Sequence, residues 1–186
     1  KTSHKVDSLN LDFYLRNTKN LPNHAIVSVG VESLSLICEK LIKQGVTNIL
    51  LEKPGALDYD QIINLNNCAI KHNSKVSIAY NRRFYHSIDL LKKQITIEGG
   101  VTSCYFDFTE WGHQIEPLKI NHLIKENWLM ANSTHIIDLV FHIIGTPKTI
   151  NSATIGSLKW HQRGAIFTGN GLSENNVPFT YHANWD

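Results

Sequence analysis

The sequence lacks the marks of several large protein classes. No apolar run approaches the roughly 20 residues that span a bilayer, and the opening Lys1-Thr2-Ser3-His4-Lys5 is not followed by the apolar stretch of a secretory signal. The formal net charge is only +2, and the lysines and arginines are scattered rather than gathered into a stripe. We therefore expect a cytoplasmic protein that binds neither membranes nor nucleic acids.

Cysteines and phosphate-binding glycines are also scarce. Cys38, Cys68 and Cys104 lie far apart in apolar surroundings, which predicts three buried free thiols and neither a disulfide framework nor a thiolate zinc site. The only close glycines, Gly99-Gly100 and Gly169-Asn170-Gly171, lie outside the strand-to-helix context of a dinucleotide fingerprint. The sequence thus contains no glycine-rich phosphate loop.

The chain nevertheless has the composition of an ordinary globular protein. Its 186 residues are 42% hydrophobic and 18% charged, enough for one large domain or two small ones. In the first half, short apolar runs alternate with longer amphipathic ones, and Gly45 stands where a helix end favours positive φ. The expected strands are 25–29, 48–51 and 75–79, and the expected helices are 34–42 and 58–71. This order predicts a partial Rossmann-like parallel sheet with right-handed crossovers, an α/β fold.

The pattern changes after Phe84. Spacing predicts an amphipathic helix over 84–95 and a helix over 132–144, while Cys104, Phe106 and Phe108 alternate along a strand at 101–109. Further strands are expected at 148–157, 165–168 and 177–183, with Gly169-Asn170-Gly171 as the turn between the last two. The second half is therefore an α+β domain with a mostly antiparallel open sheet. We place the domain boundary at residue 82, giving domains 1–82 and 83–186.

Two side chains have the chemistry to act on a carbinol. Lys53, in Glu52-Lys53-Pro54, follows a buried strand at the edge where parallel sheets bind ligands, and a partly buried ammonium can stabilise a negative oxygen. His135 stands at the start of a helix and can exchange a hydroxyl proton near neutral pH. Taken singly, a surface Lys-Pro turn and a helix-capping histidine explain the same residues.

Other polar residues gather at the same expected edge. Tyr80-Asn81-Arg82-Arg83 ends the third strand, where Asn and Arg side chains suit a carboxamide, carboxylate or phosphate. The alternative is that these arginines pair with acidic residues across a domain interface. Trp128 could line a sugar-sized pocket or belong to the core.

A metal site is the main alternative for His135, because ten histidines are many for this length. His135 and His142 share a helix face, but seven residues separate them by roughly 10 Å along the axis, too far for one ion. His135 and Asp138 could share a metal, yet no spacing marks a third ligand. We therefore predict no metal site.

The order of these motifs resembles the glucose-fructose oxidoreductase and inositol dehydrogenase family. It places Glu52-Lys53-Pro54 after one strand, Tyr80-Asn81-Arg82-Arg83-Phe84 after the next, and His135-Ile136-Ile137-Asp138 before an apolar helix that ends at Gly145. The resemblance runs from about residue 25 to residue 186.

The resemblance implies an NAD(P)-dependent oxidoreductase that transfers a hydride to or from a secondary alcohol of a sugar, sugar derivative or nucleotide sugar. Lys53 and His135 would be catalytic. The implied cofactor residues are Glu52, Pro54, Asn81 and Arg82. The implied substrate residues are Arg83, Trp128, Asn132 and Asp138. The cofactor would be NAD or NADP, and a homo-oligomer is expected.

The sequence also departs from the family. Members open with a strand, a glycine-rich turn and a helix that would precede Lys1, so we expect an internal piece that is inactive alone. Many members carry an Asp four residues before the histidine, where this chain has Ala131, followed by Asn132. Either Asn132 substitutes for that carboxylate or the chemistry is altered. The alternative function is a non-catalytic sugar-binding or scaffold protein with a dehydrogenase fold.

Overall fold

Three short apolar runs in the first half form a parallel sheet. In the computed structural model, which describes residues 10–186, β1 (His24–Val27), β2 (Asn48–Leu51) and β3 (Lys75–Ile78) lie in the order β1-β2-β3. Ile26 is in register with Leu50, and Leu50 with Ser77. The predicted parallel sheet is confirmed. The opening Lys1-Thr2-Ser3-His4-Lys5 lies outside the described residues.

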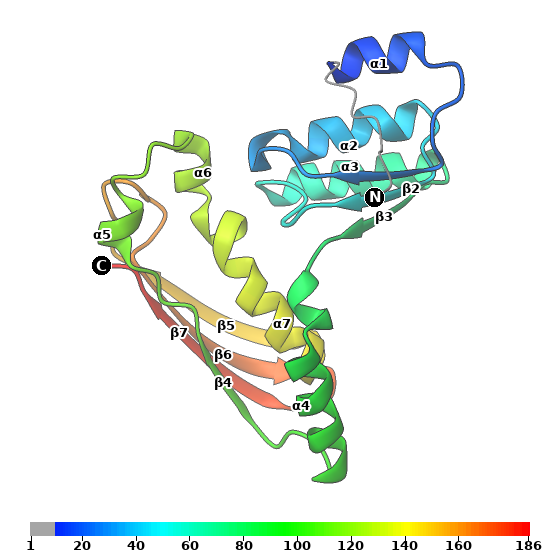
Figure 1. The fold of residues 1–186 in the computed structure, drawn as a ribbon. Coiled ribbons are helices and arrows are strands. Elements are labelled where there is room, and N and C mark those ends of the chain that lie inside the picture. Colours follow the sequence, from blue (N-terminus) through cyan, green and yellow to red (C-terminus); the bar gives the residue numbers. More distant parts are fainter. Residues whose placement is uncertain (1–9) are drawn as a thin grey trace.

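The crossover helices cover one face of this sheet (Figure 1). A 3₁₀ turn, η1 (Val31–Ser33), leads into α2 (Leu34–Lys43), and α3 (Tyr59–Lys71) joins β2 to β3. The Asp58 side chain caps α3 by accepting a 2.8 Å hydrogen bond from the amide of Gln61. Gly45 has φ +93°, as its place after α2 predicts. These contacts fix where each crossover begins and ends.

Two features of this half were not anticipated. A short helix, α1 (Leu11–Asn17), packs Leu11 and Leu15 against the core of the sheet unit. No described residue covers the sheet face opposite α2 and α3, where the Ile26 side chain is 79% exposed. The buried core therefore lies on one side of the sheet, around Leu34, Ile42 and Leu51.

A helical segment leads from the parallel sheet into the second half. It consists of the 3₁₀ turn η2 (Asn81–Phe84) and α4 (His86–Ile97). The predicted helix is present, but none of its residues is fully buried, and Phe84, which is 82% exposed, lies in η2 before it. Helical spacing of apolar residues shows which face they share. It does not supply a surface for that face to contact.

The second sheet has four strands in the order β4-β7-β6-β5. They are β4 (Cys104–Asp107), β5 (Pro147–Ile155), β6 (Ile166–Ser173) and β7 (Pro178–Asn184). Only β4 and β7 are parallel, so the predicted mostly antiparallel sheet is confirmed. Between β4 and β5 lie α5 (Gly112–Ile115), α6 (His122–Glu126), a π-helical turn η3 (Leu129–Ser133) and α7 (Thr134–Ile144). The α7 helix crosses one face of this sheet (Figure 1).

The turn predicted at Gly169-Asn170-Gly171 is wrong. These residues lie inside β6, where Asn170 is in register with Asn151 on one side and Thr180 on the other. A Cβ on Gly169 would lie 2.5 Å from the Tyr181 ring, and one on Gly171 would lie 2.7 Å from the Phe179 ring. The glycines thus let aromatic rings of β7 lie over the backbone of β6. The turn comes later, around Asn176, whose φ is +59°.

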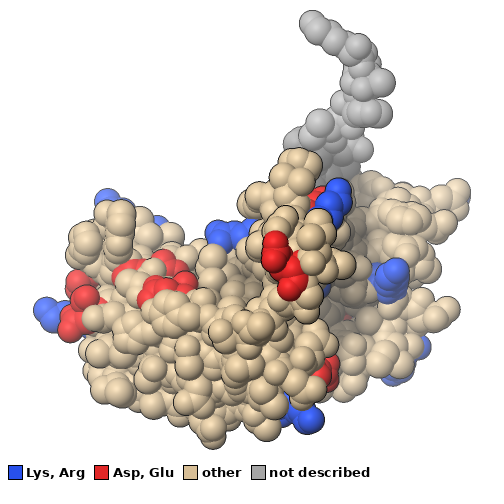
Figure 2. All heavy atoms as spheres, turned by 90° about the horizontal axis from the view of Figure 1, so that it is seen from below, with Lys and Arg blue, Asp and Glu red and all other residues tan. Residues whose placement is uncertain are grey.

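The prediction of three buried thiols was only partly right. Cys38 is buried, but Cys68 and Cys104 are only half-buried. Cys38 faces the sheet from the middle of α2, whereas Cys104 opens the edge strand β4, which has one neighbour only. No helix within residues 10–186 combines the length and apolar character needed to cross a bilayer. Figure 2 shows acidic and basic side chains dispersed over the face that it presents.

Candidate functional site

Lys53 links the two halves of the chain. It follows β2 and is joined to Pro54 by a cis peptide bond. Its Nζ donates a 2.6 Å hydrogen bond to the carbonyl oxygen of Ala131. Ala131 belongs to η3, the π-helical turn that leads into α7 and His135. Residues 53 and 135, far apart in sequence, therefore lie in one neighbourhood between the parallel sheet and the second sheet.

The electrostatics of Lys53 favour loss of its proton relative to a free lysine. Burial lowers its pKa, and Arg82 acts in the same direction, while the nearby carboxylates of Glu52 and Glu110 raise it. An ammonium at this site is only partly hydrated. It can therefore stabilise a negative oxygen on a bound molecule more strongly than a surface lysine could.

His135 is half-buried in the first turn of α7. Burial lowers its pKa, the positive charges of Lys53 and Arg82 lower it further, and Asp138 opposes them. The imidazole is therefore neutral near pH 7 and able to accept a proton. Its Nδ1 is buried and has no hydrogen-bond partner in the described chain. The Tyr80 ring packs against it edge to face, at 6.1 Å between centroids.

Arg83 and Asp138 bind each other. The Arg83 Nε donates to one carboxylate oxygen of Asp138 at 2.7 Å, and the guanidinium Nη2 donates to the other. The Arg83 guanidinium also lies over the Tyr80 ring, at 5.9 Å from its centroid. Arg83 thus pairs with an acidic residue, as in the alternative to ligand binding that we raised, but both partners belong to residues 83–186 and the pair does not cross the expected domain boundary. It ties η2 to α7 beside His135.

The remaining predicted residues differ in exposure. Glu52 and Arg82 are half-buried, Asn81 is exposed, and Pro54 is buried. Trp128 packs edge to face on Trp160 at 6.2 Å between centroids, and its buried Nε1 has no partner in the described residues. Glu52, Asn81 and Arg82 thus present polar groups at the carboxyl edge of the parallel sheet, whereas Pro54 shapes the turn beneath them.

Sequence reasoning missed Glu110. Its Oε1 accepts hydrogen bonds from Asn132 Nδ2 at 2.7 Å and from Ser133 Oγ at 3.1 Å. Asn132 is therefore bound to Glu110 and does not take the place of a carboxylate beside His135. Only the position of Glu110 could have identified it, because it follows directly after the predicted strand at 101–109.

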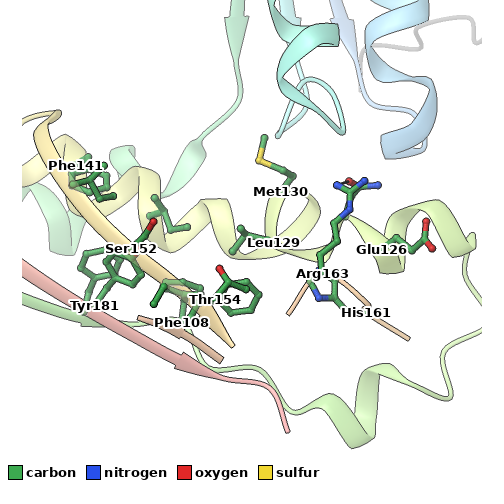
Figure 3. Close-up of a pocket in the computed structure, with 16 residues that line it drawn as sticks. Phe108, Glu126, Leu129, Met130, Phe141, Ser152, Thr154, His161, Arg163 and Tyr181 are labelled. Carbon is green, nitrogen blue, oxygen red and sulfur yellow. Dashed lines mark hydrogen bonds between the residues drawn. The ribbon is translucent and has the colours of Figure 1, made fainter. Parts of the chain in front are cut away.

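A separate cavity of about 370 Å³ lies between α7 and the second sheet (Figure 3). Its lining is mostly aromatic and aliphatic, including Phe108, Phe141 and Tyr181, with Arg163 and Glu126 among its polar members. Neither Lys53 nor His135 lines it. The neighbourhood of Lys53 and His135 is thus distinct from the apolar cavity that Figure 3 shows.

Solved structures with this fold include dehydrogenases of nucleotide sugars. One is the WlbA dehydrogenase of Chromobacterium violaceum, solved with NADH and UDP-GlcNAcA, which matches with a TM-score of 0.73 at 14% identity over 94% of this chain and 52% of its own. The WlbA dehydrogenase of Bordetella pertussis, also solved with NADH and UDP-GlcNAcA, matches with a TM-score of 0.72 at 11% identity over 94% and 51%. The UDP-N-acetylglucosamine 3-dehydrogenase GnnA of Acidithiobacillus ferrooxidans matches with a TM-score of 0.64 at 17% identity over 94% and 53%.

At these identities the likeness shows the fold alone. The chain spans about half the length of each of these dehydrogenases. No protein-family model and no curated protein matches the sequence. The fold class is therefore fixed, with the predicted α/β sheet followed by a mixed sheet, and the chemistry has to be argued from the site.

Proposed function

We propose that the protein to which this chain belongs is an NAD(P)-dependent oxidoreductase acting on a secondary alcohol of a sugar, sugar derivative or nucleotide sugar. In this proposal residues 1–82 are the later part of a nucleotide-binding domain, and residues 83–186 are part of the substrate domain. The observation that carries it is the hydrogen bond from Lys53 to Ala131, which brings the sheet-edge lysine to the turn before His135. The nucleotide sugar dehydrogenases that share the fold support the substrate class.

The proposed roles follow from charge. Oxidation breaks the C–H bond of the carbinol, forms C=O and releases the hydroxyl proton. His135 accepts that proton, since burial and neighbouring cations keep its imidazole neutral. Lys53 donates a hydrogen bond to the substrate oxygen and stabilises the negative charge that develops there. In the reverse direction His135 returns the proton.

The cofactor, when bound, supplies the hydride acceptor or donor. The residues that would hold its nicotinamide end are Glu52, Asn81 and Arg82, whose polar groups lie at the carboxyl edge where parallel sheets bind nucleotides. The Glu32 carboxylate lies close beside Gly30 in the turn after β1, where its negative charge would oppose a pyrophosphate. We therefore expect this chain alone to be inactive.

Trp128, Asn132, Arg83 and Asp138 are proposed to form the substrate side. Asn132 is held by Glu110, and Arg83 and Asp138 hold each other. These pairs give the substrate wall a fixed shape, and a direct contact between Arg83 or Asp138 and a sugar requires their pair to open. A second copy of the protein is the expected oligomeric partner.

The second candidate is a protein that binds sugar without redox chemistry. The unpartnered Nδ1 of His135 favours it, since no carboxylate orients the imidazole, and so does Ala131, which has no polar side chain to do so. The two candidates differ in turnover. A non-catalytic binder holds a nucleotide sugar and leaves reduced nicotinamide unchanged.

The test is an absorbance assay for reduced nicotinamide with the longer protein and a panel of UDP-sugars. The proposal expects turnover with at least one of them and a loss of about 10²-fold or more in Lys53→Ala and in His135→Ala. The matched variant Lys43→Ala, at an exposed lysine of α2, should change turnover little. Wild-type turnover that survives Lys53→Ala would overturn the assignment. Sugar binding by calorimetry without turnover would support the second candidate.

A further inference from the structure

Glu110 occupies a position that the proposed reaction does not yet explain. It lies in the connection between β4 and α5, and its side chain is half-buried. Among the described residues it forms no ion pair, so its charge is balanced only by hydrogen bonds and by the surrounding field. A half-buried carboxylate without a cation in contact is unfavourable unless neighbouring groups stabilise it.

Those neighbours are the residues of η3. Asn132 and Ser133 both donate to the same Glu110 oxygen, and the Ser133 side chain is almost fully buried at 2% exposure. At the end of η3 the amide of Thr134 donates to the carbonyl oxygen of Leu129, the wider spacing of a π-helical turn. Two side-chain hydrogen bonds to one carboxylate hold this irregular segment against Glu110.

The fixed segment is the one that Lys53 contacts. The carbonyl that accepts the Lys53 hydrogen bond belongs to Ala131, directly before the two residues that Glu110 holds. Glu110 also lies near enough to Lys53 for its negative charge to act on the ammonium. Burial, Glu52 and Arg82 affect the pKa of Lys53 more strongly than Glu110 does. The Glu110 carboxylate raises that pKa. The charges that act most strongly on the pKa of His135 are those of Lys53, Arg82 and Asp138.

We propose that Glu110 is a positioning residue for Lys53: it holds the Asn132-Ser133 turn that presents the Ala131 carbonyl to Lys53, and it places a negative charge near the Lys53 ammonium. The inference rests on the proposed function for its catalytic meaning, because Lys53 must carry a charge to stabilise a substrate oxygen. The placement of Glu110 against η3 stands independently of that function. Two carboxylates then have separate roles. Glu110 positions Lys53, and Asp138 binds Arg83 beside His135 on α7.

Glu110→Gln separates the charge of this residue from its hydrogen bonds. A glutamine side chain still offers an oxygen to Asn132 and Ser133 but has no charge, whereas Glu110→Ala removes both. The readout is the pKa of Lys53, followed through its Cε chemical shift by NMR as the pH is raised and assigned by its loss in Lys53→Arg. The charged groups around Lys53 in this titration are Glu52, Arg82 and Glu110, and His135 is a titratable neighbour that is neutral over this pH range.

The expected result is a fall of roughly half a pH unit or more in the Lys53 pKa of Glu110→Gln, as for removal of an opposite charge across partly hydrated protein. Glu110→Ala should give the same fall and should also speed amide exchange in η3. The matched control is Glu116→Gln, on the same connection but exposed, which should leave the Lys53 pKa unchanged. An unchanged Lys53 pKa in Glu110→Gln would overturn the proposal, whether or not the variant is less stable.

The titration needs neither cofactor nor substrate, so it fails or succeeds separately from the dehydrogenase assay. In the longer protein, Glu110→Gln should lower kcat more than it raises KM and should shift the alkaline limb of the pH profile toward lower pH. A shifted Lys53 pKa in a protein without turnover would defeat the proposed function and leave the positioning of Lys53 intact. Turnover that depends on Lys53, with no effect of Glu110→Gln on kcat or on the profile, would defeat the role of Glu110 alone.

Discussion

Arg83 and Asp138 join the turn η2, which follows the parallel sheet, to the helix α7 through a two-point ion pair. One hydrogen bond of the pair, from Arg83 Nε, is 2.7 Å long, and the Asp138 side chain is only 13% exposed. The geometry is bidentate, which Arg favours with carboxylates and Lys cannot reproduce. Because Arg83 lies on η2 and Asp138 on α7, this contact sets how the segment after β3 approaches the helix of His135.

Asp138→Asn should therefore destabilise the protein. The uncharged amide keeps one oxygen that can accept a hydrogen bond, but its NH₂ group repels the second N–H donor of the guanidinium. We expect the free energy of unfolding to fall by about 1–3 kcal/mol, as measured by denaturant titration. Arg83→Lys should lose nearly as much as Arg83→Ala. The control is Glu39→Gln, which breaks an exposed pair with Lys43 within α2 and should change little. Equal effects of Asp138→Asn and Glu39→Gln would contradict the structural role of the pair.

His135 should make stability depend on pH. Its folded-state pKa is lowered by burial and by the charges of Lys53 and Arg82, so the unfolded chain binds the proton more tightly. The stabilisation is present above the unfolded pKa of about 6.5 and is lost as the pH falls through the folded value. His142 contributes with the same sign, from burial first and then Lys92.

Thermal unfolding of wild type and His135→Gln at pH 7.5 and 5.5 measures this effect. The melting temperature of the wild type should fall more steeply between those pH values than that of His135→Gln. His113→Gln, at an exposed histidine, should keep the wild-type slope. Identical slopes in all three proteins would show that His135 is not held neutral by its surroundings.

The three cysteines should react at different rates. Burial raises the pKa of the Cys38 thiol to about 12, with Cys68 adding to the effect, so almost no thiolate forms at Cys38 in the native state. Iodoacetamide at mildly alkaline pH should modify Cys68 and Cys104, which are half-buried, long before Cys38. Mass spectrometry of the labelled peptides gives the order. Early labelling of Cys38 would mean that the core beneath α2 opens readily.

The two faces of the parallel sheet should respond differently to truncation. Ile42 packs from α2 with 0% exposure, and Ile42→Ala should lower the free energy of unfolding by about 2–5 kcal/mol, because it leaves a cavity. Ile26 is 79% exposed on the opposite face, so Ile26→Ala should cost far less in this chain. Denaturant titration of both variants compares them directly. A large loss from Ile26→Ala would show that another surface covers that face in solution.

Much of the fold could be predicted from local patterns. Burial of one apolar face gives a strand or helix a characteristic spacing of apolar residues over a short stretch of sequence. This spacing identified the strands around Ile49 and Val76 and the helix from Leu34 to Ile42. Asp58 and Gly45 mark helix ends for equally local reasons, a side-chain cap and a positive φ. The motifs around Lys53 and His135 could also be found, because strand ends and helix starts place them.

Features that depend on a distant surface could not be predicted. The glycines at 169 and 171 read as a turn, but they lie inside β6 because rings from β7 need space above them. The spacing of apolar residues predicted the helix α4, but it could not show that the described chain leaves none of them fully buried. Glu110 gave no signal of its own, since its partners Asn132 and Ser133 come from another element.

By itself the sequence determined the two kinds of sheet, the order of their elements and the positions of a lysine and a histidine at element ends. Those properties follow from hydrophobic periodicity and backbone preference, which act over a few residues. Only the tertiary structure decided that Lys53 meets Ala131, that Arg83 is engaged by Asp138, and that Glu110 stands behind η3. Contacts of that kind depend on how sheets and helices pack across long sequence separations, and no short stretch of sequence encodes the geometry at which they meet.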